Sequence, residues 1–296
     1  MNARATFLSL MAAFGWLTLA GVAPAQEDRS AATATAEAPS ASGTAAGTDQ
    51  PIEVQADQAL EWHRDEKAYV ARGNAVATRG DVSVRADTLT AYYRERPDGG
   101  TEIYRLSAEG NVVIAAPEQK AFGDRGVYDV DQEVAVLTGD DLRLTTPQDV
   151  VTARDSLEYW RTRNLAVARG DAVATRGDSR VRADRLVGLL ENNAKGNLEM
   201  TRIDAEGGVV ITTPKDVARG NQGTYDVAKR VAVLTGDVKI TRGKNQLNGT
   251  AAEVDLETGI SRILSGSGKD KGRVRGLFVP GQEAGAGAAP PKGNAP

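Results

Sequence analysis

Residues 70–89 have the sequence VARGNAVATRGDVSVRADTL, and residues 167–186 have the sequence VARGDAVATRGDSRVRADRL. Sixteen of the 20 aligned positions are identical, at a distance of 97 residues. The match continues, because RLSAEGNVVIAAP at 105–117 returns as RIDAEGGVVITTP at 202–214, and VAVLTGD occurs at both 134–140 and 231–237. Self-similarity at a fixed period indicates a repeat architecture, so the chain is a duplication that forms one elongated domain.

Within each copy the hydrophobic pattern has a period of two. Val82 and Val84 lie on one face of a predicted strand and Arg85 on the other, and the same alternation appears at 128–130 and 238–240. This pattern is typical of half-buried β-strands. Glycines followed by Asn, Asp or Gly are expected to adopt positive φ and predict turns every ten to fifteen residues or so. We therefore expect an all-β fold of short antiparallel strands with almost no helix.

The predicted interior is made of small side chains. Phe, Trp and Tyr together make up 5% of the chain, so Val, Ala, Leu and Thr must line the inside. Two sheets held apart by such residues would leave a groove, whereas a thin sandwich would pack to normal density. The composition leaves both alternatives open.

The two ends differ from the repeats in composition. Residues 1–25 contain an apolar run that ends in small residues, which is typical of a cleaved secretory signal, with an uncleaved anchor as the alternative. Residues 26–48 and 281–296 lack large apolar residues and are predicted to be a disordered linker and a disordered tail. The repeat domain is therefore expected at 49–280. The absence of cysteine excludes disulfides and thiolate metal sites.

No pattern in the sequence predicts catalysis, a metal site or a cofactor. Acidic pairs such as Asp140 and Asp141 lie in predicted turns, where acids are common for backbone reasons. The acids at 129, 131 and 133 resemble part of a calcium loop, but the repeat has D-x-A-x-R at 226–230. His63 is the single histidine, and a net charge of −4 gives no general attraction to nucleic acid. We expect a protein that is not an enzyme.

Arginines recur at matching positions of the two copies. Guanidinium groups spaced in this way could bind phosphates, or they could keep one face of a sheet solvated. We favour the solvated face. The pairs are Arg72 and Arg169, Arg79 and Arg176, and Arg85 and Arg182.

Three segments together resemble a known family. TDQPIEVQADQ at 48–58, the repeated VAVLTGD and KGRVRGLFVP at 271–280 resemble the OstA family of periplasmic lipopolysaccharide-transport proteins, known as LptA. The resemblance covers about residues 48–282 and implies an elongated, twisted antiparallel β-jelly roll that is open at both ends. The doubled middle departs from the family pattern.

The resemblance also implies a function. Such a protein would shelter the acyl chains of lipopolysaccharide and carry this lipid from the inner to the outer membrane. Its expected partners are an LptC-like inner-membrane protein at the N-terminal edge, an LptD-like outer-membrane protein at the C-terminal edge, and further copies stacked head to tail. The alternative is a structural periplasmic scaffold that binds only proteins.

The expected lipid-binding residues come from the resemblance and from the alternating pattern. The resemblance places Ile52 and Val54 at a lipid-lined entrance, makes Tyr128 and Val130 an inward pair, and suggests a phosphate contact at Arg94. The repeat and the alternation extend this set to further inward positions, namely Val82, Val84, Val181, Tyr225 and Val227.

Overall fold

The computed structural model describes residues 52–97, 99–193, 198–255, 261–265 and 274–279. Residues 1–25, 26–48 and 281–296, predicted as signal, linker and tail, lie outside these ranges. The described strands pair antiparallel throughout, which confirms the all-β fold. They are β1 (Glu53–Gln55), β2 (Ala59–His63), β3 (Ala68–Arg79), β4 (Val82–Glu95), β5 (Thr101–Ala116), β6 (Gln119–Asp129), β7 (Val134–Thr138), β8 (Leu142–Thr145), β9 (Asp149–Ala153), β10 (Ser156–Trp160), β11 (Leu165–Arg176), β12 (Ser179–Asn192), β13 (Leu198–Thr212), β14 (Val217–Asp226), β15 (Val231–Arg242), β16 (Asn245–Asp255), β17 (Ser261–Leu264) and β18 (Arg275–Leu277).

Many strands are longer than the sequence predicted. β5 has 16 residues and β13 has 15, because most of the Gly-Asn, Gly-Asp and Gly-Gly pairs do not end a strand. These pairs lie in the middle of strands, where the pairing register shifts by a β-bulge, for example between Glu109 and Val112 and between Glu206 and Val209. The prediction of turns at these pairs was wrong. A bulge bends a strand without ending it, so each long strand continues past the pair.

The bend depends on glycine. Gly110 has φ +77° and Asn111 has φ +50°, a left-handed conformation that glycine adopts without strain. A Cβ atom on Gly110 would also lie 2.1 Å from Oδ2 of Asp87, which accepts a hydrogen bond of 2.9 Å from the Asn111 side chain. Gly207 repeats this geometry against Asp184, with φ +77° and the same 2.1 Å approach.

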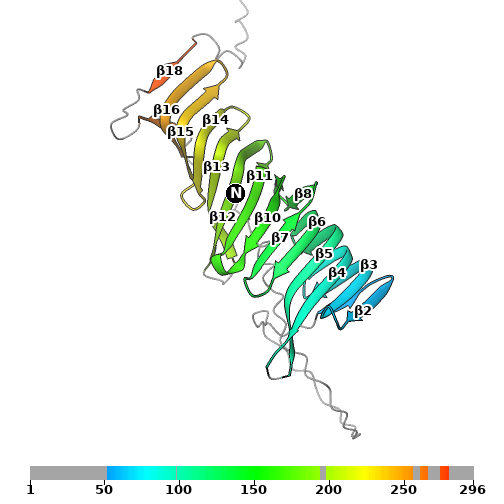
Figure 1. Ribbon diagram of the computed structural model, residues 1–296. Coiled ribbons are helices and arrows are strands. Elements are labelled where there is room, and N and C mark those ends of the chain that lie inside the picture. The colour runs from blue at the N-terminus through cyan, green and yellow to red at the C-terminus, as the bar shows by residue number, and fades with distance from the viewer. Residues whose placement is uncertain (1–51, 98, 194–197, 256–260, 266–273, 280–296) are drawn as a thin grey trace, which may run out of the picture.

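The bends divide the sheet into two layers. Layer 1 contains β2, β7, β10, β17 and the halves of long strands that pair with them, and layer 2 contains β1, β8, β9, β18 and the other halves. In β3, for example, Ala68–Arg72 pairs with β2 and Val76–Thr78 pairs with β1. The strands follow one another along a long axis from β2 to β18 (Figure 1). At ~4.8 Å between neighbouring strands, fourteen strand positions give a length of about 65 Å.

The duplication is visible in the strands. The first copy comprises β1 to β8 and the second comprises β9 to β15, so β3 to β6 correspond to β11 to β14. The two copies join without a break, because β7 pairs with β10 and β8 pairs with β9. η2, a short 3-10 turn at Arg161–Arg163, follows β10. Among the described residues, no helix has the length and apolar character needed to cross a membrane.

The main core lies where the two layers meet near the bends. It joins Leu137 and Leu157 of layer 1 to Ile114, Leu142 and Leu144 of layer 2 in one cluster of buried side chains. A second cluster in layer 1 contains Tyr128 and Tyr159. The apolar faces of the two layers are therefore turned toward each other, and this arrangement forms the elongated β-jelly roll.

Candidate functional site: the inner face

A continuous row of apolar residues crosses layer 2. Each member is the register partner of the next, so all of them point to the same side of the layer. Ten members belong to the main core or pack against it, which identifies this side as the inner face. We call the set the layer-2 row; in order it is Val54, Ala77, Val84, Ile114, Ala121, Leu144, Val151, Ala174, Val181, Ile211, Ala218, Ile240, Leu247 and Gly276.

Layer 1 carries a second inward row. Its central members belong to the cluster around Tyr128 and Tyr159. Unlike the layer-2 row, it contains several aromatic residues. We call this set the layer-1 row; in order it is Trp62, Tyr69, Ala91, Leu106, Tyr128, Ala135, Tyr159, Ala166, Gly188, Ile203, Tyr225, Ala232 and Val254.

Solvent exposure changes along both rows. At the N-terminal end Val54 is 40% exposed and Trp62 is 55% exposed, whereas Ile114, the fourth member of the layer-2 row, is 2% exposed. Most layer-2 members after β8 are again half-buried. The inner face is therefore packed in one stretch of the molecule and partly exposed to solvent on both sides of that stretch.

The structure places most of the expected lipid-binding residues in these rows. Val54, Val84 and Val181 belong to the layer-2 row, and Tyr128 and Tyr225 belong to the layer-1 row. The others lie beside the rows. Ile52 immediately precedes β1, and Val82 lies opposite Arg79 at the end of the β3–β4 hairpin in layer 2. Val130 packs against the Tyr128 cluster, and Val227, just after β14, donates its N–H to the carbonyl oxygen of Thr201.

Sequence reasoning missed the members between the motifs. Leu144 and Val151 lie in β8 and β9, and Ile211 lies in β13. Alternation was the available signal, since Leu142 and Leu144 flank Arg143 as Val82 and Val84 flank a serine. Alternation alone does not show which strands are neighbours, so only the register joins these residues into a row.

Two tyrosines of the layer-1 row are buried. Burial raises the pKa of Tyr159 to about 12, and burial also raises the pKa of Tyr128, while the positive charge of Arg161 opposes both shifts. Arg161 itself donates a 2.8 Å hydrogen bond to Glu133. The Tyr128 hydroxyl has no hydrogen-bond partner among the described residues. Both phenols therefore remain neutral at physiological pH.

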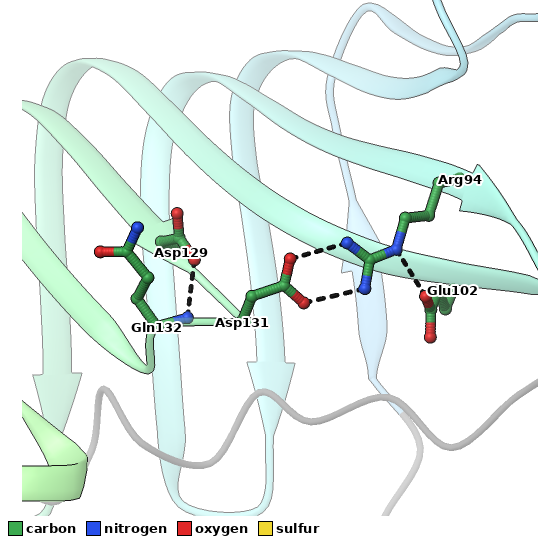
Figure 2. Close-up of polar contacts among 5 residues, drawn as sticks. All are labelled: Arg94, Glu102, Asp129, Asp131 and Gln132. Atoms are coloured by element: carbon green, nitrogen blue, oxygen red, sulfur yellow. Dashed lines mark hydrogen bonds and ion pairs between the residues drawn. The ribbon is translucent and has the colours of Figure 1, made fainter.

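Two of the acids that resembled a calcium loop, Asp129 and Asp131, face different partners (Figure 2). Both oxygens of Asp131 accept hydrogen bonds from Arg94, at 2.7 and 2.9 Å, and Arg94 also donates to Glu102 at 2.5 Å. Asp129 instead accepts the backbone N–H of Gln132 at 2.8 Å. These contacts hold the Arg94 guanidinium between two carboxylates, which supports an ion-pairing role over the suggested phosphate contact.

Recurring arginines are paired with carboxylates in the second copy. Arg176, at the end of β11, makes two hydrogen bonds of 2.7 and 2.8 Å to Asp149, at the start of β9. Arg169 donates to Glu158 at 2.6 Å. Burial raises the pKa of Glu158, but hydrogen bonds from Arg169, Trp160 and Ser156 outweigh it and hold the pKa below its usual value. These pairs favour a structural role for these arginines.

Comparison with known proteins identifies the family. The model for the family described as LptA/(LptD N-terminal domain) LPS transport protein matches residues 53–163 and matches again at residues 154–260. The two matches span most of the described strands. The chain therefore belongs to this family of lipopolysaccharide-transport proteins.

Two individual proteins are similar to parts of the chain. An uncharacterized protein of Rhizobium meliloti (strain 1021) is 27% identical over 125 residues, which is 41% of this chain and 67% of that protein. A crystal structure of LptH, the LptA-homologous periplasmic component of the lipopolysaccharide transport device of Pseudomonas aeruginosa, aligns over 78% of this chain and 97% of that one, at 14% identity and a TM-score of 0.20. The family assignment rests on the family model.

Proposed function

We propose that the chain is an LptA-type periplasmic bridge protein, which shelters the acyl chains of lipopolysaccharide between its layers on the way to the outer membrane. One observation carries the proposal: the layer-2 row is aliphatic or glycine at all fourteen positions. Each methylene kept from water contributes ~0.8 kcal/mol, so a carrier must cover an acyl chain at every step. A lipid that moves along such a row exchanges one apolar contact for another, and each step requires little free energy.

Photo-crosslinking tests this function with matched neighbours. Val84 points to the inner face and Arg85, the next residue in β4, points outward, while Val181 and Arg182 repeat the pair in β12. We expect a crosslinking residue at Val84 or Val181 to capture purified lipopolysaccharide, and one at Arg85 or Arg182 to capture little. Equal capture at inward and outward positions would contradict the proposal.

A packed centre supports a second candidate function. Tyr159 and Ile114 are among the largest fully buried side chains, as expected of a periplasmic scaffold with a filled core that binds only proteins. The same experiment separates the two, because a scaffold would show no capture of lipid at Val84 or Val181 while it retained its protein partners.

The strand edges support partners at both ends of the bridge. Among the described strands, β1 and β2 pair only with β3, and β17 and β18 pair only with β16. Such edges present unpaired N–H and C=O groups that a strand of another chain can complete. We assign the N-terminal edge to an LptC-like protein and the C-terminal edge to an LptD-like protein, with further copies of this chain able to stack between them.

The second copy suggests how a partner would cover the N-terminal edge, because β10, the counterpart of β2, pairs with β7. Leu60 and Trp62 in β2 correspond to Leu157 and Tyr159 in β10. Leu60 is 66% exposed, whereas Leu157, which pairs with Leu137 of β7, is 6% exposed. A partner strand that resembles β7, with apolar residues such as Leu and Ala at alternate positions, would bury Leu60 and Trp62 in the same way. Leu60→Asp should therefore weaken association at this edge.

A further inference from the structure

The layer-2 row is closed at one place, in the sense that consecutive members are buried there. Ile114 in β5, Ala121 in β6 and Leu144 in β8 are consecutive members, and all three are buried. Their neighbours on either side, Val84 and Val151, are half-buried. Ala218 is also buried, but it is a single small residue between two half-buried isoleucines. The three members in β5, β6 and β8 are thus the only run of buried positions in the described row.

The layer-1 row is closed over a longer stretch that overlaps this one. Tyr128 in β6 and Ala135 in β7 are buried, and the burial continues through Tyr159 in β10 and Ala166 in β11 to Gly188 in β12. Leu190 of β12 belongs to this cluster, and Leu198 and Met200 of β13 pack against it. The row becomes half-buried again from Ile203 onward. Because β6 contributes to both layers and β7 and β8 are consecutive, the closed parts of the two rows overlap at the level of β6 to β8.

From this coincidence we propose that β5 to β8 form a closed waist that divides the inner face into two lipid compartments in series. The N-terminal compartment comprises both rows at β1 to β4, and the C-terminal compartment comprises the layer-2 row from β9 onward and the layer-1 row from β13 onward. Passage between them requires the side chains around Leu144 and Tyr128 to move apart, which makes the waist the slow step of transfer. The inference rests on the proposed function, because it assumes that acyl chains occupy the rows.

The lengths agree with this division. Layer 2 has three strand positions before the waist and eight after it, which at ~4.8 Å per position is about 15 Å and about 40 Å. One leaflet of a bilayer has a hydrocarbon thickness of about 15 Å, half of the membrane core. The N-terminal compartment therefore matches the length of one acyl chain, and the C-terminal compartment is longer than one.

Thiol labelling tests the waist without lipid. The chain has no cysteine, so a single introduced thiol reports only its own position. Leu144 corresponds to Ile240 of the second copy, which makes Leu144→Cys and Ile240→Cys a matched pair. We expect a water-soluble maleimide to label Leu144→Cys at least about tenfold more slowly, because labelling there requires local opening. Ile114→Cys and Ile211→Cys provide an independent second pair. Equal rates within both pairs would overturn the waist.

Transfer of lipid provides the second test. Leu247→Trp narrows the C-terminal end, so purified lipopolysaccharide must enter beside Val54 and cross the waist to reach a crosslinking residue at Val181. In this background we expect capture at Val84 to precede capture at Val181 by about tenfold in time, and Leu144→Ala to shorten the delay. Ile240→Ala, the matched control, should leave the delay unchanged.

The outcomes separate the two proposals. Capture at Val84 and Val181 at the same rate, together with equal thiol labelling of the matched pairs, would overturn the waist and leave the lipid-carrier function intact. Absence of capture at both positions in the parent chain would overturn the carrier function, and with it the waist. A delay that Leu144→Ala and Ile240→Ala shorten equally would also contradict the waist.

Discussion

The two copies share their local geometry but not their burial. Gly110 and Gly207 have the same φ and meet their aspartates at the same distance. Ile114 and Ile211, four residues further on in each copy, differ: the first is fully buried and the second is half-buried. Backbone conformation is set by neighbours in the sequence, whereas burial is set by what packs across the interior. A duplicated sequence therefore reproduces its bends and does not have to reproduce its core.

Truncation of the two isoleucines should show the largest difference between the copies. We expect Ile114→Ala to lower the free energy of unfolding by about 3–4 kcal/mol, because it leaves a cavity in the packed waist. Ile211→Ala should lower it by about 1–2 kcal/mol, since part of that side chain is already in water. Urea denaturation followed by circular dichroism measures both. Equal losses would show that the two positions are packed alike.

Substitution of the bulge glycines should have the same effect in both copies. Gly110→Ala and Gly207→Ala each introduce a Cβ atom against an aspartate and force alanine to a positive φ, so each should destabilise the protein by about 2 kcal/mol. Gly177→Ala is the control, because its φ is also positive but no atom lies within 4 Å of the added Cβ. This control should lower the free energy of unfolding less in the same denaturation experiment. Losses at Gly110 and Gly207 that differ by more than about 1 kcal/mol would contradict the shared geometry.

The edge ion pairs offer a smaller comparison within the second copy. Asp149, which pairs with Arg176, has a side chain that is 3% exposed, whereas the side chain of Asp216, which pairs with Arg242, is 27% exposed. We expect Asp149→Asn to destabilise by about 2 kcal/mol and Asp216→Asn by less than about 1 kcal/mol, because solvent screens the more open pair. Thermal denaturation of the two variants at neutral pH gives the ranking, and the reverse order would contradict it.

The ion pair of Asp216 with Arg242 also predicts that the stability of the fold depends on pH in the acid range. The hydrogen bond from Arg242 lowers the pKa of Asp216, and burial opposes the shift. A lowered folded-state pKa stabilises the protein above the unfolded value of 3.8, and this contribution is lost as the pH falls through the folded-state value. Asp216→Asn should therefore reduce the loss of stability on acidification below about pH 4, without affecting the response near neutral pH.

The smallest expected effect on stability comes from the titration of His63, whose counterpart in the second copy is Trp160. A hydrogen bond with Glu61 raises the pKa of His63, with a further contribution from Glu66, and burial opposes the shift. The contribution to stability is complete below the unfolded value of 6.5 and is lost as the pH rises through the raised folded-state value. As the chain has one histidine, NMR titration of a single imidazole should give a pKa above 6.5, and Glu61→Gln should lower it.

Some parts of the fold and the inner face could be predicted from the chain alone. Alternation at 82–86 and 238–240 identified strands and their inward residues, because period two is a property of the strand itself. The Gly-Asn and Gly-Asp pairs were correctly expected to have positive φ but were assigned to turns. A turn and a bulge use the same backbone conformation, and only the partner strand decides between them.

The amino-acid sequence by itself determined that this protein is a duplicated, cysteine-free β chain with small inward side chains, since these properties depend on composition, spacing and period. The tertiary structure alone decided which inward residues line up into rows, and which of them are closed at β5 to β8. Register and burial depend on strands that are distant in the sequence, so the same motif can be buried in one copy and open in the other.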